Sequence, residues 1–266
     1  MDVNPIFILC LILSLTLFSI SSKIVKHSIK GYQRLALRVM SLVLALVSLS
    51  IPITYVLNNL GENPLYATFR AYPYTELLII LSAPLIGTLH RLLTTHKRNP
   101  VITGLCLIIM LSYVSLPFAK PLIRPLQKDL QNKWSNDVAI QTTASTCGPS
   151  SLATIFKYYG KEDTEANIAK QAYTSASSTE NWYLARYADE QGFNYQFLTI
   201  AGLDKIPTPA IIGVRLGNMG HFITLLNNDN GLYEIADSLS GKSFLSLEQF
   251  NQRYRYTGFV LHITPR

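Results

Sequence analysis

QTTASTCGPS, at positions 141–150, is the stretch of this chain that says most about its fold. Cys147 follows a run of Ser and Thr residues, which are favoured just before a helix, and Pro149 suits the first helical turn. Apolar residues then recur with helical spacing as far as Tyr159, and Gly160 follows where a helix often ends. The pattern predicts a helix that begins near Cys147 and holds the thiol at its N-terminus.

This position bears on the chemistry of Cys147. Unpaired backbone amides and the helix dipole at an N-terminus favour thiolate over thiol, and the thiolate is the nucleophilic form. A small buried residue at a helix start is the alternative interpretation of a single cysteine. Cys10 and Cys106 lie in apolar runs of the first half, so the second half contains no disulfide partner for Cys147.

Two further residues complete a candidate site. His221 heads the apolar run 222–226, and Asp237 ends the run 232–236. The sequence NNDNG at 227–231 predicts a hairpin between these runs, because Asn and Gly tolerate positive φ. The histidine can then accept the thiol proton, and the aspartate can fix the tautomer of the ring. Taken singly, a histidine at a strand edge and an aspartate in a turn are also common structural residues.

The second half of the chain reads as helices followed by strands. Further helices are predicted over 164–173 and 180–191. Short β-branched or aromatic runs predict strands over 194–199, 210–214, 221–226, 232–236 and 257–263. Helices that precede an antiparallel sheet indicate one α+β domain, predicted over residues 134–266.

These residues resemble the peptidase C39 family of papain-like cysteine peptidases, which are known for cutting peptide leaders after a Gly-Gly pair. The matching segments are Cys147-Gly-Pro-Ser150, Gly220-His221-Phe222, and Ala236-Asp237-Ser238 followed by Gly241. Gln141, six residues before Cys147, matches the family's oxyanion glutamine. Ser150 stands where Ala is common and Ser238 where Pro is usual, but neither change removes a reacting atom. The resemblance covers about residues 134–263.

The resemblance implies a cysteine peptidase in which Cys147 attacks a peptide carbonyl, His221 transfers protons and Asp237 orients the ring. Gln141 is implied to stabilise the oxyanion. Cleavage after small residues such as Gly-Gly and a separate transporter or secretion partner are also implied. Exporters of this family carry an ATPase in the same chain, whereas no G-x-x-x-x-G-K-[ST] phosphate loop occurs here, so ATP is not expected to bind by that route.

Two other functions remain open on the sequence. The same catalytic residues suit a papain-like amidase or transamidase acting on cell-wall or other peptides. A non-catalytic membrane module that only binds peptides is the second alternative, although an intact set of catalytic residues argues against it.

The first half of the chain carries the excess of apolar residues. Overall, 48% of residues are hydrophobic, 15% are charged and the mean hydropathy is +0.22, whereas charged residues make up about a quarter of ordinary soluble domains. Apolar runs at 5–22, 39–57, 75–93 and 101–118 predict about four transmembrane helices within residues 1–119. Arg91 lies inside the third run and has to reach an interface by snorkelling. Residues 120–133 are predicted to form a juxtamembrane linker.

The basic charge has the same uneven distribution. Residues 1–133 contain 13 Lys and Arg against 4 Asp and Glu, and residues 134–266 contain 10 against 12. The second half therefore offers no basic face for nucleic acid. Positive residues crowd the first loop (Lys23, Lys26, Lys30, Arg34 and Arg38) and the third (Arg91, Lys97 and Arg98).

Positive loops are typical of the cytoplasmic side of a membrane. The prediction is an integral protein of a bacterial inner membrane with an extracytoplasmic catalytic domain. A cytoplasmic domain is the alternative if the third run does not cross.

The remaining histidines offer no site for a metal ion. His27, His90, His96 and His262 lack the spacing to Cys or acidic residues that metal ligands show. Neither a metal nor a cofactor is predicted. The expected partners are membrane lipid and a peptide or protein substrate.

Overall fold

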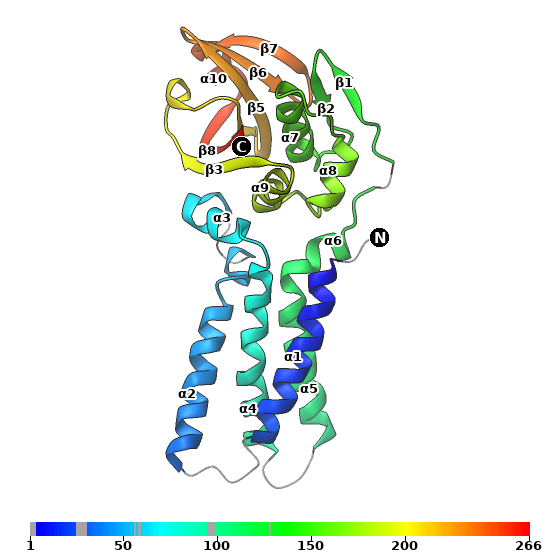
Figure 1. Cartoon of the computed structure of the whole chain (residues 1–266), viewed down its shortest axis with the longest axis vertical. Helices are drawn as coiled ribbons and strands as arrows, with labels where there is room; N and C mark the ends of the chain where they lie inside the picture. Colours follow the sequence, from blue (N-terminus) through cyan, green and yellow to red (C-terminus); the bar gives the residue numbers. More distant parts are fainter. Residues whose placement is uncertain (1–3, 25–30, 56, 58–59, 95–98, 128) are drawn as a thin grey trace. The chain divides into compact units, whose positions relative to one another are not determined.

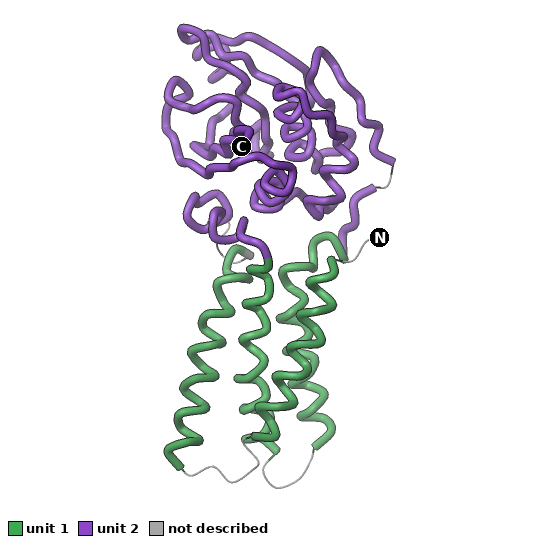
Figure 2. The backbone as a smooth tube through the Cα atoms, in the orientation of Figure 1, with its two compact units in different colours: residues 1–58, 74–122 green, residues 59–73, 123–266 purple. Residues whose placement is uncertain are grey.

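The chain divides into two compact units. The computed structural model describes residues 4–24, 31–55, 57, 60–94, 99–127 and 129–266. Unit 1 consists of residues 1–58 and 74–122, and unit 2 consists of residues 59–73 and 123–266 (Figure 2). Unit 2 therefore includes the segment between the second and third apolar runs, which the sequence alone assigned to the transmembrane region.

Unit 1 is helical (Figure 1). Its elements are α1 (Pro5–Ile24), α2 (Gly31–Ser48), η1 (Pro52–Tyr55), η3 (Thr75–Ser82), α4 (Ala83–Leu93), α5 (Pro100–Ser115), η4 (Leu116–Phe118) and α6 (Ala119–Ile123). Within the described residues, three stretches are long and apolar enough to cross a membrane: Pro5–Ile24, Thr75–Leu93 and Pro100–Ile123. These correspond to the first, third and fourth predicted runs.

The second predicted run differs from the helix that the structure places there. The helix α2 begins at Gly31 and ends at Ser48, so it includes the polar residues Gln33, Arg34 and Arg38 and stops before Pro52. Proline has no amide hydrogen for a helix interior, which explains why the helix does not continue to residue 57. Lys26, Lys30, Lys97 and Arg98, on which the topology prediction also rests, lie outside the described residues.

Small and polar residues join α1 to α4. A Cβ atom at Gly87 would lie 2.7 Å from the carbonyl oxygen of Phe18, so only glycine permits this approach of the two backbones. Nδ1 of His90 lies 3.0 Å from the Ser22 hydroxyl, and Nε2 of His90 lies 3.0 Å from the Thr103 hydroxyl of α5. Small residues and interhelical hydrogen bonds of this kind are typical of helix packing in membranes.

Unit 2 is an α+β domain, as predicted. Its helical elements are η2 (Leu60–Glu62), α3 (Pro64–Ala71), α7 (Cys147–Tyr158), α8 (Glu165–Gln171), α9 (Asn181–Glu190), η5 (Leu203–Lys205) and α10 (Leu247–Arg253). Its strands are β1 (Lys133–Ser135), β2 (Val138–Ile140), β3 (Phe193–Thr199), β4 (Ala210–Leu216), β5 (Met219–Asp229), β6 (Leu232–Asp237), β7 (Gly241–Ser246) and β8 (Arg255–Pro265). Strands β3 to β8 form one antiparallel sheet in the order β3-β8-β4-β5-β6-β7.

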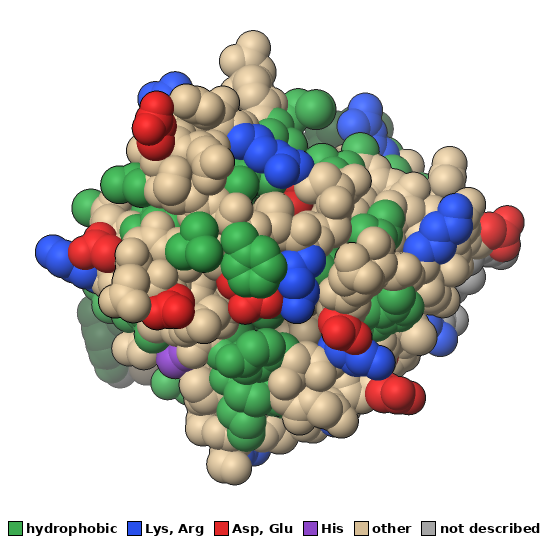
Figure 3. Space-filling view, turned by 90° about the horizontal axis from the view of Figure 1, so that it is seen from above, with side chains coloured by type: hydrophobic (Ala, Val, Ile, Leu, Met, Phe, Trp, Pro, Cys, Tyr) green, Lys and Arg blue, Asp and Glu red, His purple; other side chains and the backbone are tan. Residues whose placement is uncertain are grey.

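The sheet buries both of its faces. Ile211 and Leu261 belong to a core that includes side chains of α7 and α9, whereas their neighbours Ile212 and Val260 belong to a second core with Phe250 of α10. Successive residues of a strand point to opposite faces, so these strands are apolar without interruption. Figure 3 shows one face of the molecule, on which basic, acidic and apolar side chains are mixed.

The predicted helices and strands of unit 2 are confirmed with small shifts of their ends. The hairpin predicted at 227–231 joins β5 to β6, and Asn230 and Gly231 have φ angles of 52° and 84°. The sequence patterns did not predict β1, β2, β7, α3 or α10. The strands β1, β2 and β7 are short or partly polar, which leaves little periodic signal.

Candidate active site

Cys147 is the first residue of α7, as predicted. The side chain of Thr146, which precedes the helix, makes no capping hydrogen bond to it. Pro149 has no amide hydrogen, and the Ser150 amide bonds the Thr146 carbonyl at 3.0 Å. The amides of Cys147 and Gly148 therefore remain to act on a negative charge at the thiol or at a bound oxyanion.

Gly148 leaves no room for a side chain. A Cβ atom there would lie 2.9 Å from a methyl carbon of Leu184, on α9. The glycine after the cysteine thus lets the start of α7 pack closely against α9.

Hydrogen bonds hold the start of α7 against the strand that carries the histidine. The Ser151 hydroxyl donates to the Phe222 carbonyl at 3.3 Å, and the Thr224 hydroxyl donates to the Ser151 carbonyl at 3.3 Å. On the other side, buried Glu165 accepts hydrogen bonds of 2.6 Å from both the amide and the hydroxyl of Thr142. Cys147 therefore lies between two fixed points, one in the loop before it and one in the first turns of α7.

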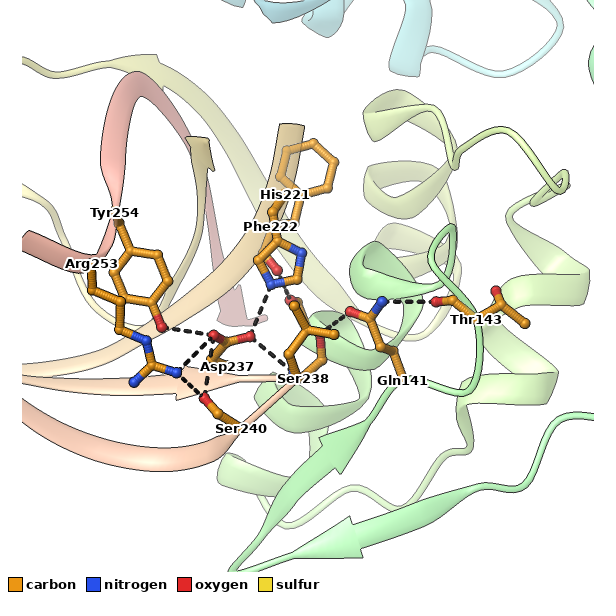
Figure 4. A network of polar contacts seen from close by, with 11 residues as sticks. Gln141, Thr143, His221, Phe222, Asp237, Ser238, Ser240, Arg253 and Tyr254 are labelled. Carbon is orange, nitrogen blue, oxygen red and sulfur yellow. Dashed lines mark hydrogen bonds and ion pairs between the residues drawn. The ribbon is translucent and has the colours of Figure 1, made fainter. Parts of the chain in front are cut away.

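His221 and Asp237 form a buried hydrogen-bonded pair. The histidine, on β5, is 7% exposed, and the aspartate, at the end of β6, is 1% exposed. Nε2 of the ring lies 2.9 Å from Oδ1 of the carboxylate (Figure 4). Cys147 lines the same cavity as His221, and the bond of Nε2 to Asp237 leaves Nδ1 as the ring nitrogen available to the thiol. The structure thus brings all three predicted residues together.

Several other groups satisfy the Asp237 carboxylate. The Tyr254 hydroxyl donates to Oδ2 at 2.7 Å, the Leu239 amide to Oδ1 at 2.9 Å and the Ser240 hydroxyl to Oδ2 at 3.3 Å. Arg253 lies with Nη2 3.5 Å from Oδ2. A buried carboxylate with this many donors remains ionised and keeps one orientation. These partners could not be predicted from the sequence, because no local pattern links residues 253 and 254 to the aspartate.

The same contacts set the charges of the pair. Burial alone would raise the pKa of Asp237, but hydrogen bonds from His221, the Leu239 amide and Tyr254 outweigh it and lower that pKa to about 2. Burial likewise opposes the charged form of His221, but its hydrogen bonds to Asp237 and Cys147 raise its pKa to about 9. An imidazolium beside a cysteine and an ionised aspartate is therefore the favoured state at neutral pH.

Gln141 lies between the cysteine loop and the aspartate turn. Its amide Nε2 donates to the Thr143 carbonyl at 2.8 Å, and its Oε1 accepts a bond of 2.6 Å from the Ser238 hydroxyl (Figure 4). Its backbone amide also bonds the Ser238 carbonyl at 3.0 Å. One hydrogen of the side-chain amide is therefore already used, and a second remains.

A cavity of about 310 Å³ opens at Cys147 and His221. Its lining also includes Gly148, Phe222 and residues 213–215, but it does not include Gln141. A cavity of this size lies at the lower end of the range for ligand sites in proteins.

A cysteine at a helix N-terminus, paired with a histidine and an aspartate on an antiparallel sheet, defines the papain-like class of fold. Residues 135–266 match the model of the Peptidase C39 family, and this region of the chain belongs to that family.

Relatives match the same half of the chain. An uncharacterized protein of Methanothermobacter thermautotrophicus is 27% identical over 124 residues, which are 47% of this chain and 85% of that protein. The transport/processing ATP-binding protein ComA of Streptococcus pneumoniae is 27% identical over 130 residues, which are 47% of this chain but 18% of ComA. Among solved structures, the match includes the crystal structure of the peptidase domain of Streptococcus ComA, which is described as a bifunctional ABC transporter involved in quorum sensing. The two sequences are 21% identical and the TM-score is 0.44. The match covers 48% of this chain and 98% of that domain.

Proposed function

We propose that this chain is a membrane-anchored cysteine peptidase in which Cys147, His221 and Asp237 are the catalytic residues. The observation that carries this proposal is the buried His221–Asp237 hydrogen bond beside a cavity that Cys147 and His221 both line. The finer proposal, cleavage of peptide leaders after small residues such as Gly-Gly, rests on the family resemblance.

The geometry supports acyl transfer. The Cys147 sulfur attacks the peptide carbonyl carbon, and the carbonyl electrons move to the oxygen. The His221 imidazolium gives its proton to the leaving amine as the C–N bond breaks, which leaves a thioester. Water then attacks the thioester while the neutral imidazole takes its proton, and the thiolate leaves. Asp237 keeps the ring oriented and stabilises its charged form throughout.

Gln141 is proposed to donate its second side-chain N–H to the developing oxyanion, together with the amides at the start of α7. Removal of one such donor costs about 3 kcal/mol in the transition state. Gln141→Ala is therefore expected to lower kcat by roughly two to three orders of magnitude, with the fold intact by circular dichroism.

Two further variants separate this role from a purely structural one. Gln141→Glu keeps an oxygen for Ser238 but has no N–H at neutral pH, so it should lower kcat as much as alanine does. Ser238→Ala removes only the bond to Oε1 and should cost much less. Near-normal turnover of the alanine variant would refute the oxyanion role.

The pH profile of kcat/KM reports the ionisation of His221. The imidazolium must protonate the leaving amine, and it is lost as the pH rises through its pKa of about 9, so the alkaline limb should lie near that pH. Asp237→Asn removes the charge that raises this pKa and should move the limb to lower pH. An alkaline limb that stays in place in the asparagine variant would contradict the coupling between the two residues.

The two chain segments that make up unit 2 bear on the side of the membrane on which the catalytic domain lies. Residues 59–73 and 123–266 form one compact unit, so they lie on the same side of a membrane. The chain between them then crosses an even number of times, which fits two crossings by Thr75–Leu93 and Pro100–Ile123. The Lys and Arg residues in the sequence of the loop between these helices support the proposal that this loop is cytoplasmic and that the catalytic domain lies outside.

This topology can be tested with a membrane-impermeant thiol reagent in bacteria that express the chain. Cys147 is partly exposed, whereas Cys10 and Cys106 are buried. Labelling of Cys147 is expected in spheroplasts. Labelling of Cys147 only in inverted vesicles would show that the catalytic domain lies on the cytoplasmic side.

A further inference from the structure

The segment 60–73 belongs to the same compact unit as the peptidase region, although it lies outside the residues that match the peptidase family. It contains η2 and α3, joined at Asn63. The Asn63 side chain accepts hydrogen bonds from the amides of Leu65 and Tyr66, at 3.1 and 3.2 Å, and Pro64 occupies the first helical position. These are strong start signals for a helix, so the segment has a defined local structure.

Contacts with α9 anchor this segment at both ends. The Asn181 side chain donates to the Gly61 carbonyl at 2.7 Å, and Nε of Arg186 donates to the Ala71 carbonyl at 3.3 Å. Between these points, the buried guanidinium of Arg70 lies 4.5 Å from the centre of the Trp182 ring. Buried cation–π and hydrogen-bond contacts of this kind fix a segment in one position.

The anchored segment brings Glu62 to the catalytic cavity. Glu62, one residue after the anchored Gly61, is part of the same cavity lining as Cys147 and His221. Its carboxylate is exposed and makes no ion pair with another described residue. Arg215 of β4, also exposed, is the other charged residue of fixed sign in this lining.

We propose that the segment 60–73 forms one wall of the substrate cleft and that Glu62 favours substrates with a Lys or Arg side chain near the scissile bond. This inference rests on the proposed peptidase function. A peptide in the cavity that contains Cys147 passes the Glu62 carboxylate, and a cationic side chain there gains an attraction that a neutral or acidic one does not. Because both charges are partly in water, the preference should be about three- to fivefold and should fall as salt is added.

The test uses the full chain in detergent and a series of peptidyl acyloxymethyl ketones that end in Gly-Gly. Each probe carries Lys, Gln or Glu at one of the preceding positions, and the measured quantity is the second-order rate of modification of Cys147. At one or more positions, the Lys probe should react about three- to fivefold faster than the Glu probe. Glu62→Gln should remove this preference, and Glu62→Lys should reverse it.

Matched variants locate the effect. Glu248→Gln removes an exposed carboxylate of α10 that is not part of the cavity, and it should leave the preference unchanged. Asn181→Ala removes the anchor at Gly61 and should weaken the preference, while the rate with the small neutral reagent iodoacetamide stays constant.

The possible failures can be told apart. Equal rates for Lys and Glu probes at every position, or a preference that survives in Glu62→Gln, would overturn this inference alone. Failure of every probe and of iodoacetamide to react at Cys147 in the folded chain would overturn the proposed peptidase function and this inference with it.

Discussion

Replacement of Cys147 by alanine is expected to abolish peptide hydrolysis, with a fall in kcat of about 10⁵- to 10⁶-fold, as for nucleophiles of comparable catalytic triads. Among the described residues that line the cavity, Cys147 is the one cysteine. The side chain is only partly buried, so its loss should leave the fold and the His221–Asp237 pair intact. The measurement is turnover of a peptide mixture followed by mass spectrometry, which also identifies the bond that breaks.

Cys106→Ala is the matched control for this variant. Cys106 is a free cysteine of α5 in unit 1, so its removal should leave turnover unchanged. Hydrolysis that persists in Cys147→Ala would show that the thiol is not the nucleophile. Products in which an amine has replaced water, or in which only cell-wall amides are cleaved, would instead identify the amidase or transamidase alternative.

Replacement of His221 by alanine should lower kcat by about 10⁴- to 10⁶-fold, because the residue is needed both to receive the thiol proton and to protonate the leaving amine. It also leaves the Asp237 carboxylate buried without its histidine partner, although Tyr254 and the Leu239 amide still satisfy it. The fold should therefore persist, and circular dichroism with thermal unfolding checks this.

His262→Ala serves as the control for the histidine. His262 lies on β8 of the same sheet and does not belong to the cavity lining. Its replacement should leave turnover within a few-fold of normal. If His221→Ala and His262→Ala had similar turnover, His221 would have no special part in the reaction.

Local sequence predicted most of the helices and strands of the C-terminal half of the chain. Ser, Thr and Pro around Cys147 predict the helix that begins there. The NNDNG turn predicts that His221 and Asp237 lie on paired strands. These signals act over a few residues, where backbone preference and turn chemistry dominate.

Other features depend on contacts between distant parts of the chain. Tyr254 hydrogen-bonds to Asp237 because α10, which precedes it, packs against the sheet. Glu62 lines the cavity because α9 holds its segment by contacts between residues more than 100 positions apart in sequence. The residues next to Glu62 and Tyr254 in sequence give no signal that predicts these long-range contacts. Hydropathy also misplaced the second helix, since apolar content alone does not register that Pro52 interrupts the run 39–57.

The most direct test of the catalytic assignment is the rate at which iodoacetamide modifies Cys147 in the full chain at pH 6 to 7. A cysteine at a helix N-terminus that lines the same cavity as an imidazolium is expected to react well above the rate of an ordinary exposed thiol, and this excess should disappear in His221→Ala. A rate equal to that of an ordinary thiol, unchanged by the loss of His221, would contradict the account and would favour a module that only binds peptides.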